Sequence, residues 1–400
     1  MSRLITLFIG GAALWPAAAA AQATVVVTPA VRVEAAHDSN VLWRPAARED
    51  DIWRLSPSLH FLRDTPRSHW LGDIALDAEW YARHTDLSTP FARQHAALQG
   101  NVHATERTRF ELSAGYDSGI RPAELNLATG LTPGRVRGTR WFGGAEAAYA
   151  VTPRTDLVGR GRSTRELTET ADAFIQDAEA RVRHDWNDRN GGHVRYLAQY
   201  FTFDAGALTS HVMAAGWTRR LTPTLQLELD GGVRQGVGRL RPEIEAGAAY
   251  RGRFADVRMR YVWTHTTALG VLGLVEAQGA VLTVRYARPQ IVSASLDAAV
   301  HRNTFGEERS DVYRFSAEIV KPVIGVLSIA AGWSLDHHRG LFVSAVDDGE
   351  GPLVPEPERD DRFTRHVLLL RVLVSGSVRS MAGPREPQVV RPGGEGEAQR

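Results

Sequence analysis

Residues 173–204 read AFIQDAEARVRHDWNDRNGGHVRYLAQYFTFD, and their side chains alternate in character along two runs. In the first run one alternate set is mostly apolar, whereas the other consists of Ile175, Asp177, Glu179, Arg181, Arg183 and Asp185. The second run alternates in the same way between Val194, Tyr196, Ala198 and Tyr200 on one side and Arg195 and Gln199 on the other. Because successive side chains of a strand point to opposite faces, the stretch predicts two strands joined by the polar turn 187–191.

Aromatic residues at the strand ends favour a membrane barrel over a soluble sheet, which alternates in the same way. Trp186 and Tyr200 both belong to the apolar faces. Transmembrane β-barrels carry girdles of such residues at the two membrane interfaces. We therefore expect the hairpin to be one unit of an outer-membrane β-barrel. The interface aromatics predicted on this basis are Trp70, Trp80, Tyr116, Trp186, Tyr200, Tyr261 and Trp263.

The same alternation recurs along most of the chain and predicts an all-β, antiparallel up-and-down transmembrane barrel over residues 24–378. Counting the runs gives about eighteen strands, with sixteen as the alternative. Short turns such as Thr152-Pro153-Arg154 alternate with longer segments. Barrels with short periplasmic turns and long extracellular loops show this arrangement, and an even strand count places both barrel ends in the periplasm.

Charged residues on the second face are expected to line a water-filled lumen, because arginine at the centre of a bilayer costs about 2–4 kcal/mol. The predicted pore-lining residues are Asp73, Asp77, Glu79, Asp177, Glu179, Arg181, Arg183, Arg195, Glu228, Asp230, Arg234, Arg258, Arg260, Arg314 and Arg371. Two roles are open for them. They either pair across strands and hydrate the pore, or form an electrostatic path for a polyanionic or hydroxyl-rich glycan.

The long segment 119–138 contains two prolines and two internal glycines. In a porin such a segment either folds into the barrel and narrows it or stays at the surface, and we expect the surface position. A second long segment, 339–361, is acidic. We expect it to be solvated, with bound Ca²⁺ or a cation-mediated contact to lipopolysaccharide as the alternative.

The two ends of the chain differ in composition from the barrel. Residues 1–23 combine Arg3, an apolar run and the ending Ala21-Gln22-Ala23, which predicts a Sec-type signal peptide cleaved near Ala23. The expected location is therefore the bacterial outer membrane. Residues 379–400 are rich in Pro, Gly and Glu, which predicts a disordered periplasmic tail. The last expected strand, unlike that of most outer-membrane barrels, does not end on an aromatic residue.

Composition and motifs argue against several other classes. The chain has no cysteine, which excludes disulfides and thiolate metal sites, and its net charge of +1 gives no reason to expect a nucleic-acid partner. It contains neither Gly-x-Ser-x-Gly nor His-Glu-x-x-His. His337 and His338 are adjacent, so a strand would point them to opposite faces. We therefore expect no enzyme activity, no catalytic residues, no metal and no cofactor.

The opening of the chain carries a more specific set of motifs. Asp38-Ser39-Asn40-Val41 follows the first expected strand, Asp50-Asp51-Ile52-Trp53 closes an acidic loop, and Leu55-Ser56-Pro57-Ser58-Leu59 begins the next strand. This arrangement resembles the start of the β-barrel porins encoded with exopolysaccharide operons, which are EpsL-like or associated with PEP-CTERM systems. The resemblance implies a large barrel that helps to export a surface polysaccharide, together with a periplasmic export protein.

Three functions follow as hypotheses. The first is a passage for a secreted or capsular polysaccharide, which rests on the resemblance. The second is a general diffusion porin for small solutes, and the third is a structural or adhesive barrel with a plugged lumen. In each case the expected partners include outer-membrane lipid, lipopolysaccharide and the barrel assembly machinery.

Overall fold

The chain forms one antiparallel sheet in a computed structural model that describes residues 23–43, 45–121, 125–126, 128–131, 135–169, 171–204, 206–236, 239–269, 271–288, 290–306, 308–340, 362–376 and 378–382. Its strands are β1 (Ala23–Asp38), β2 (Asp50–Thr65), β3 (Ser68–Tyr81), β4 (Thr89–His103), β5 (Thr108–Gly119), β6 (Gly138–Thr152), β7 (Thr155–Leu167), β8 (Asp172–Asn187), β9 (Asn190–Phe203), β10 (Gly206–Arg220), β11 (Leu225–Gly236), β12 (Arg239–Arg251), β13 (Ala255–Ala268), β14 (Val271–Arg288), β15 (Val292–Phe305), β16 (Glu308–Ile324), β17 (Leu327–Gly340), β18 (Arg362–Ser375) and β19 (Val378–Ala382). A short 3₁₀ helix, η3 (Thr85–Leu87), lies between β3 and β4. No helix in these ranges is long and apolar enough to cross a membrane.

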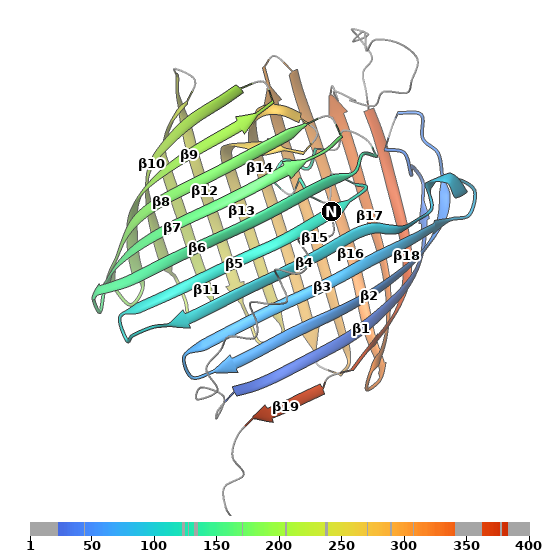
Figure 1. Cartoon of the computed structure of the whole chain (residues 1–400), viewed down its shortest axis with the longest axis horizontal. Coiled ribbons are helices and arrows are strands. Elements are labelled where there is room, and N and C mark those ends of the chain that lie inside the picture. The colour runs from blue at the N-terminus through green and yellow to red at the C-terminus, as the bar shows by residue number, and fades with distance from the viewer. Residues whose placement is uncertain are drawn as a thin grey trace, which may run out of the picture.

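The sheet closes on itself because the first strand pairs with the last. Val33 of β1 lies opposite Val372 of β18, and Val25 of β1 lies opposite Ser380 of β19. β18 and β19 pair with successive parts of β1, so together they occupy one strand position in the ring. The nineteen described strands therefore form a closed ring of eighteen strand positions. Figure 1 shows the barrel and the tilt of its strands. The predicted fold class and strand count are confirmed.

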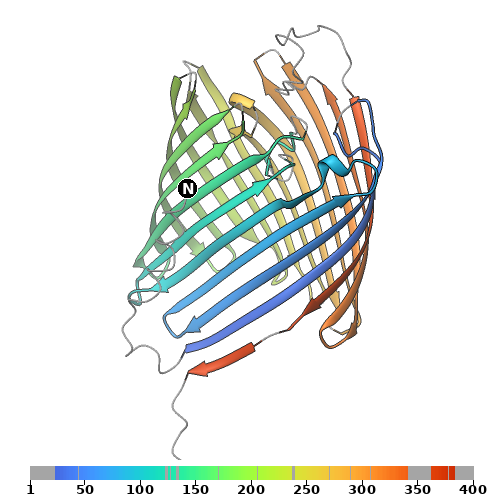
Figure 2. The same ribbon diagram turned by 45° about the vertical axis from the view of Figure 1, so that its right-hand side comes forward.

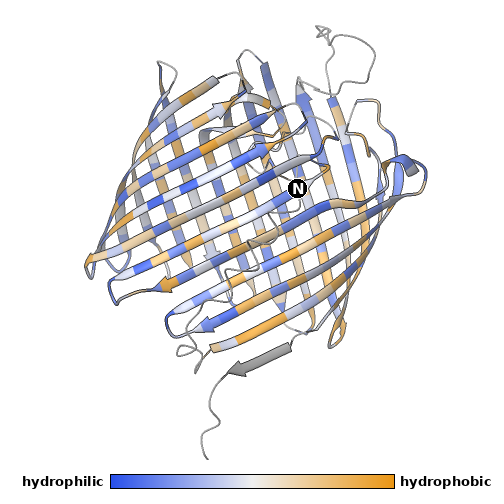
Figure 3. Cartoon of the chain, viewed as in Figure 1, coloured by the Kyte–Doolittle hydropathy of each residue, from blue (hydrophilic) through white to orange (hydrophobic). Residues whose placement is uncertain are grey.

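Strand register keeps two faces separate around the whole ring. Glu34 lies opposite Arg54, which in turn lies opposite Glu79. One residue away, Val33 lies opposite Leu55, and both are well exposed, at 45% and 38%. Figure 3 shows this alternation of polar and apolar residues along the strands. Because a closed barrel satisfies its backbone hydrogen bonds internally and charges are costly in hydrocarbon, the apolar face meets lipid and the charged face forms the lumen.

The two rims differ in the length of their connections. One rim, called here the short-turn rim, has brief connections such as 66–67, 104–107, 153–154 and 188–189. The opposite rim, called here the loop rim, carries the longer segments 39–49, 82–88 and 120–137. Ala23 and Ala382 lie opposite each other, so both ends of the described barrel are at the short-turn rim. This is the arrangement that the sequence predicts for periplasmic turns and extracellular loops.

Strand pairing continues beyond the predicted end of the barrel. β19 extends it to Ala382, four residues into the segment expected to be a disordered tail, because the first residues of β1 still offer a free backbone edge there. The predicted signal peptide, apart from Ala23, and the remainder of the tail lie outside the described residues. The acidic segment expected at 339–361 also lies outside them, except for Arg339 and Gly340 at the end of β17.

Candidate functional site

The segment between β5 and β6, residues 120–137 and called here the inward loop, is held at its base by β3. Arg121 donates hydrogen bonds to Glu79 Oε2 at 2.9 Å and to the Tyr81 hydroxyl at 3.2 Å. Arg135 donates to the same hydroxyl at 2.7 Å and to the carbonyl oxygen of Leu87 at 2.9 Å. Two arginines near the ends of the loop therefore share one tyrosine, which fixes the direction in which the loop leaves the wall.

The tip of the inward loop is bound to a distant part of the ring. Asn126 accepts a hydrogen bond from the backbone N–H of Leu269 at 2.8 Å and donates to the Leu269 carbonyl at 3.2 Å. On β15, the Asn303 amide donates to the carbonyl of Thr129 at 2.8 Å. On β16, Arg314 donates to the carbonyl of Gly130 at 3.0 Å. A loop that starts between β5 and β6 and ends against β15 and β16 has crossed the lumen, and Figure 2 shows this end of the barrel.

Apolar packing accompanies these hydrogen bonds. Leu131 of the inward loop is 8% exposed and forms a buried cluster with Ala268, Val275 and Val312. Val275 and Val312 belong to the lumen-facing positions of β14 and β16, where charged or polar residues predominate elsewhere in the ring. Burial of a leucine side chain contributes roughly 1.5–3 kcal/mol. The cluster therefore packs the inward loop against the far wall through apolar contacts.

The expectation that segment 119–138 stays at the surface is wrong. The physical reason is the buried apolar cluster together with four hydrogen bonds to the far wall. Two of these bonds are made by the Asn126 side chain, and two are accepted by the backbone carbonyls of Thr129 and Gly130. A signal was present in the sequence, because Val275 and Val312 occupy positions where the strand alternation calls for polar residues. Such a misfit indicates an inward-facing residue that is covered by another part of the chain.

The turn between β13 and β14 also leans into the barrel. Thr267 donates a hydrogen bond to Glu166 Oε2 of β7 at 2.8 Å, although these strands are far apart in the ring. Leu269 lies against the inner side of Gly138, where an added Cβ would be 3.5 Å from it. Arg140 joins the two inward segments, since it donates to Glu166 at 2.9 Å and to the Leu125 carbonyl at 2.7 Å. The inward loop and this turn together narrow the lumen near the loop rim.

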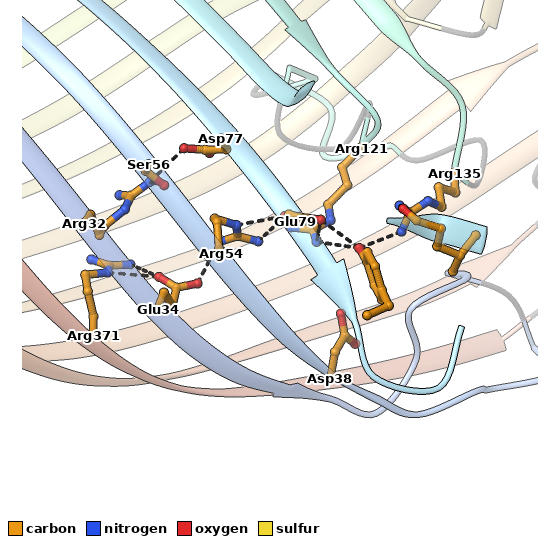
Figure 4. A network of polar contacts seen from close by, with 12 residues as sticks. Arg32, Glu34, Asp38, Arg54, Ser56, Asp77, Glu79, Arg121, Arg135 and Arg371 are labelled. Atoms are coloured by element: carbon orange, nitrogen blue, oxygen red, sulfur yellow. Dashed lines mark hydrogen bonds and ion pairs between the residues drawn. The ribbon is translucent and has the colours of Figure 1, made fainter. Parts of the chain in front are cut away.

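A row of alternating charges lines the wall beside the base of the inward loop (Figure 4). Arg54 donates to Glu34 at 2.7 Å and to Glu79 at 2.8 Å. Arg371 donates to Glu34 at 2.7 Å and to Glu318 at 2.8 Å. The carboxylates Glu34 and Glu79 are only 2% exposed, so each is compensated by arginines rather than by water. This row spans β16, β18, β1, β2 and β3 and fixes the charged side chains in place.

The register places all fifteen predicted pore-lining residues on the charged face. Most of them have a carboxylate or arginine partner. Arg195 contacts Asp230 at 3.3 Å, and Arg314 contacts Asp336 at 3.2 Å. Further pairs join Asp77 to Arg32, Arg181 to Glu179, Arg183 to Asp185, Arg234 to Glu243, Arg258 to Asp256, Arg260 to Glu245 and Asp73 to His95. Their role in conduction stays a prediction.

Several charged residues of the same face did not enter the prediction. They are Glu34, Arg54, Arg121, Arg140, Glu166, Asp336 and Arg365. Except for Arg121, each lies on a strand at the alternation that defines the lumen, so extension of the pattern to every strand would have found them. Arg121 lies in the inward loop, where no periodic pattern exists.

The predicted interface aromatics lie on the apolar face. Trp80, Trp186 and Tyr200 are exposed by 47%, 54% and 43%. Trp263 differs, because its indole N–H donates to Glu276 Oε1 at 2.9 Å. Among the described residues, no group of three or more His, Asp or Glu side chains has an arrangement that could hold a metal ion.

Comparison with known proteins gives a likeness in fold only. No family model and no curated protein matches the chain, so the proposed resemblance to EpsL-like porins has no support from either. Similar solved structures include Pseudomonas aeruginosa OccK2 (OpdF), with a TM-score of 0.45, 9% identity and coverage of 88% of this chain and 98% of that one. Acinetobacter baumannii OccAB2 gives 0.44, 8%, 88% and 98%, and the siderophore receptor PirA from Pseudomonas aeruginosa gives 0.38, 8%, 89% and 80%. At these TM-scores the function has to be argued from the chain's own residues.

Proposed function

We propose that the protein is an outer-membrane channel through which small polar solutes diffuse. The observation that carries the proposal is the inward loop, which crosses a lumen lined by ionised side chains and is attached to both walls. A charged lumen holds water, and a loop across it limits the size of what passes. The closed barrel with an apolar exterior supports the outer membrane as its location, because closed sheets are the only strand structures that span lipid.

The inward loop argues against the passage of a polysaccharide. A polymer has to thread the lumen along its whole length, and the loop would have to leave the far wall to let it through. That movement would expose Leu131 and break the hydrogen bonds of Asn126, Asn303 and Arg314. A small solute needs only the space beside the loop, so the structure fits a general diffusion channel better than a polysaccharide exporter.

The paired charges favour polar solutes of either sign over one class of ion. Arginines and carboxylates alternate along the wall and neutralise each other at contact distance, as Arg54 does with Glu34 and Glu79. Because the charges of such pairs largely cancel, the net electric field in the lumen is weak. We therefore infer a channel selected mainly by size, with modest ion selectivity that depends on the few exposed arginines.

Single-channel conductance of the refolded full chain in a planar bilayer tests the proposal. We expect a stable open channel in salt solution, blocked partly and reversibly by small sugars and indifferent to acidic or neutral polysaccharides. A channel closed by one polysaccharide class at low concentration would favour export instead. A barrel that inserts but stays silent at all voltages would favour the plugged structural barrel.

A further inference from the structure

The wall of the barrel is split between two neighbouring strands near the loop rim. β12 and β13 pair only from Ile244 opposite Trp263 to Arg251 opposite Asp256. Beyond Ile244, residues 239–243 of β12 keep only β11 as a neighbour, and residues 264–268 of β13 keep only β14.

Two features of the chain keep the strands apart. Pro242 lies within the unpaired part of β12, and proline has no backbone N–H to donate to a neighbouring strand. The β13–β14 turn is drawn into the barrel by the contacts of Thr267 with Glu166 and of Leu269 with Asn126. On the β12 side the split is therefore favoured by a residue of the sequence, Pro242. On the β13 side it is stabilised by the tertiary contacts of the β13–β14 turn.

A cavity of about 460 Å³ occupies the split. One side of it is formed by Ser210, Arg234 and Gly236, which belong to the lumen-facing positions of β10 and β11. The other side is formed by His265, Glu276 and Thr304, which by register share the face of the lipid-exposed Met259 and Val300. The inward tilt of the β13–β14 hairpin therefore creates a side pocket that lies between the hairpin's outer face and the inner face of β10–β12.

The side pocket is rich in arginine. Arg234, Arg239 and Arg241 line it, and among the residues that the structure describes Glu276 is the one carboxylate in its lining. Arg234 is held by Glu243 at 2.9 Å, and Arg241 contacts Glu276 across the split. Arg239 is exposed and makes no hydrogen bond or ion pair with any residue that the structure describes. Among these described side chains, three arginines face the two carboxylates Glu276 and Glu243, which leaves one positive charge in excess.

A histidine in the same pocket has unused hydrogen-bonding capacity. The side chain of His265 is 10% exposed, and neither ring nitrogen has a hydrogen-bond partner within the described part of the chain. Its Nε2 lies 3.6 Å from Glu276 Oε2, beyond hydrogen-bond distance. Buried polar groups are normally hydrogen-bonded, so an imidazole that lines a cavity and makes no hydrogen bond to the described residues indicates a missing hydrogen-bond partner.

We propose that this side pocket binds a phosphate group. Guanidinium groups match the geometry of phosphate oxygens and bind them through paired N–H donors, and an imidazole N–H adds a further donor. Arg239 supplies the uncommitted charge, and Arg241 can turn from Glu276 toward the ligand. The phosphate belongs either to a small phosphorylated solute or to the headgroup of a glycolipid that reaches the pocket from the side. The pocket shares Ser210, Arg234 and Gly236 with the lumen-facing side of β10 and β11, but phosphate binding there does not depend on the proposed diffusion function.

Calorimetric titration of the full chain in detergent tests the site. Glucose 6-phosphate represents the soluble source, and lipopolysaccharide with and without its phosphates represents the lipid source. We expect binding of at least one phosphate-bearing probe, weakened about tenfold or more in R239Q/R241Q. The single variant R239Q should weaken it as well, and it should fold like the unmodified chain because it removes no hydrogen bond or ion pair found among the described residues.

The variant R258Q/R260Q is the matched control. It removes the same charge from β13 at positions far from the pocket, toward the short-turn rim. Phosphate binding should be unchanged in it. Equal weakening in both double variants would show a non-specific charge effect and overturn the proposal. Absence of binding by the unmodified chain to every phosphate-bearing probe would overturn it as well.

Discussion

Arg365 connects two buried carboxylates at the loop rim. It donates to Asp38 Oδ2 at 2.7 Å and to Asp336 Oδ2 at 3.1 Å, and its guanidinium lies 4.0 Å from the ring centroid of Trp43. Asp38 is only 1% exposed, so water does not replace the arginine if it is lost. Loss of one partner of a buried ion pair leaves an uncompensated charge, which is more costly than loss of an exposed pair.

The substitution R365M should therefore destabilise the barrel by about 3–5 kcal/mol, although methionine retains much of the volume. Urea unfolding of the refolded barrel in lipid vesicles measures the difference. R183M is the control, because Arg183 and Asp185 form an exposed pair whose loss should cost about 0–1 kcal/mol. Equal losses for the two variants would show that Asp38 finds compensation elsewhere.

At the scale of elements, the strands were predictable and the inward segments were not. Alternation in residues 173–204 is a local property, and the register that it predicts for β8 and β9 needs no knowledge of the rest of the chain. The inward loop depends on Asn126 meeting Leu269, 143 residues away. Pro242 is a proline inside a strand, which is unusual because proline has no backbone N–H. Its position is explained by the absence of pairing with β13 beyond Ile244, which only the structure shows.

The attachment of the inward loop to the far wall can be weakened at one residue. The substitution N126A removes the hydrogen bonds with the Leu269 backbone and with the Leu131 carbonyl. Of these, only the two bonds to Leu269 join the loop to the far wall, so at about 0.5–1.5 kcal/mol for each the loop loses roughly 1–3 kcal/mol of its attachment. The loop should then leave the lumen for part of the time, which increases the single-channel conductance and its fluctuations.

A variant in a short turn provides the comparison for N126A. In T222A the side chain no longer accepts hydrogen bonds from the N–H groups of Thr224 and Leu225, which lie at the short-turn rim. Its conductance should equal that of the unmodified chain. If N126A conducts no more than T222A, the inward loop does not limit the flow of ions.

At the scale of the whole molecule, closure and charge are linked. The seam between β1 and β18 is bridged by Arg371 and Glu34, which are 337 residues apart. Each strand's pattern predicts that both residues face inward, but no pattern predicts which two charges meet. The sequence could therefore predict which residues of the candidate site face inward. The pairing of their charged side chains decides how strong an electric field remains in the lumen, and it could be read only from the closed ring.

Ion selectivity tests whether the inward charges control passage. Arg258 and Arg260 contact Asp256 and Glu245, and their side chains are still about 60% exposed, so they add positive potential to the lumen toward the short-turn rim. The double reversal R258E/R260E changes the local charge by four units. The reversal potential in a salt gradient should shift toward cations, by more at low ionic strength because salt screens exposed charges.

A matched reversal on the opposite face separates lumen charge from net charge. Arg302 and Arg309 both contact Asp311, and by register they lie on the face that points away from the lumen. R302E/R309E changes the net charge by the same amount but should leave the reversal potential unchanged. If both double variants shift the reversal potential equally, ion selectivity depends on the net charge of the protein and not on the charge of the lumen. If neither shifts it, Arg258 and Arg260 do not line the path of the ions, and the conducting path has to lie elsewhere in the barrel.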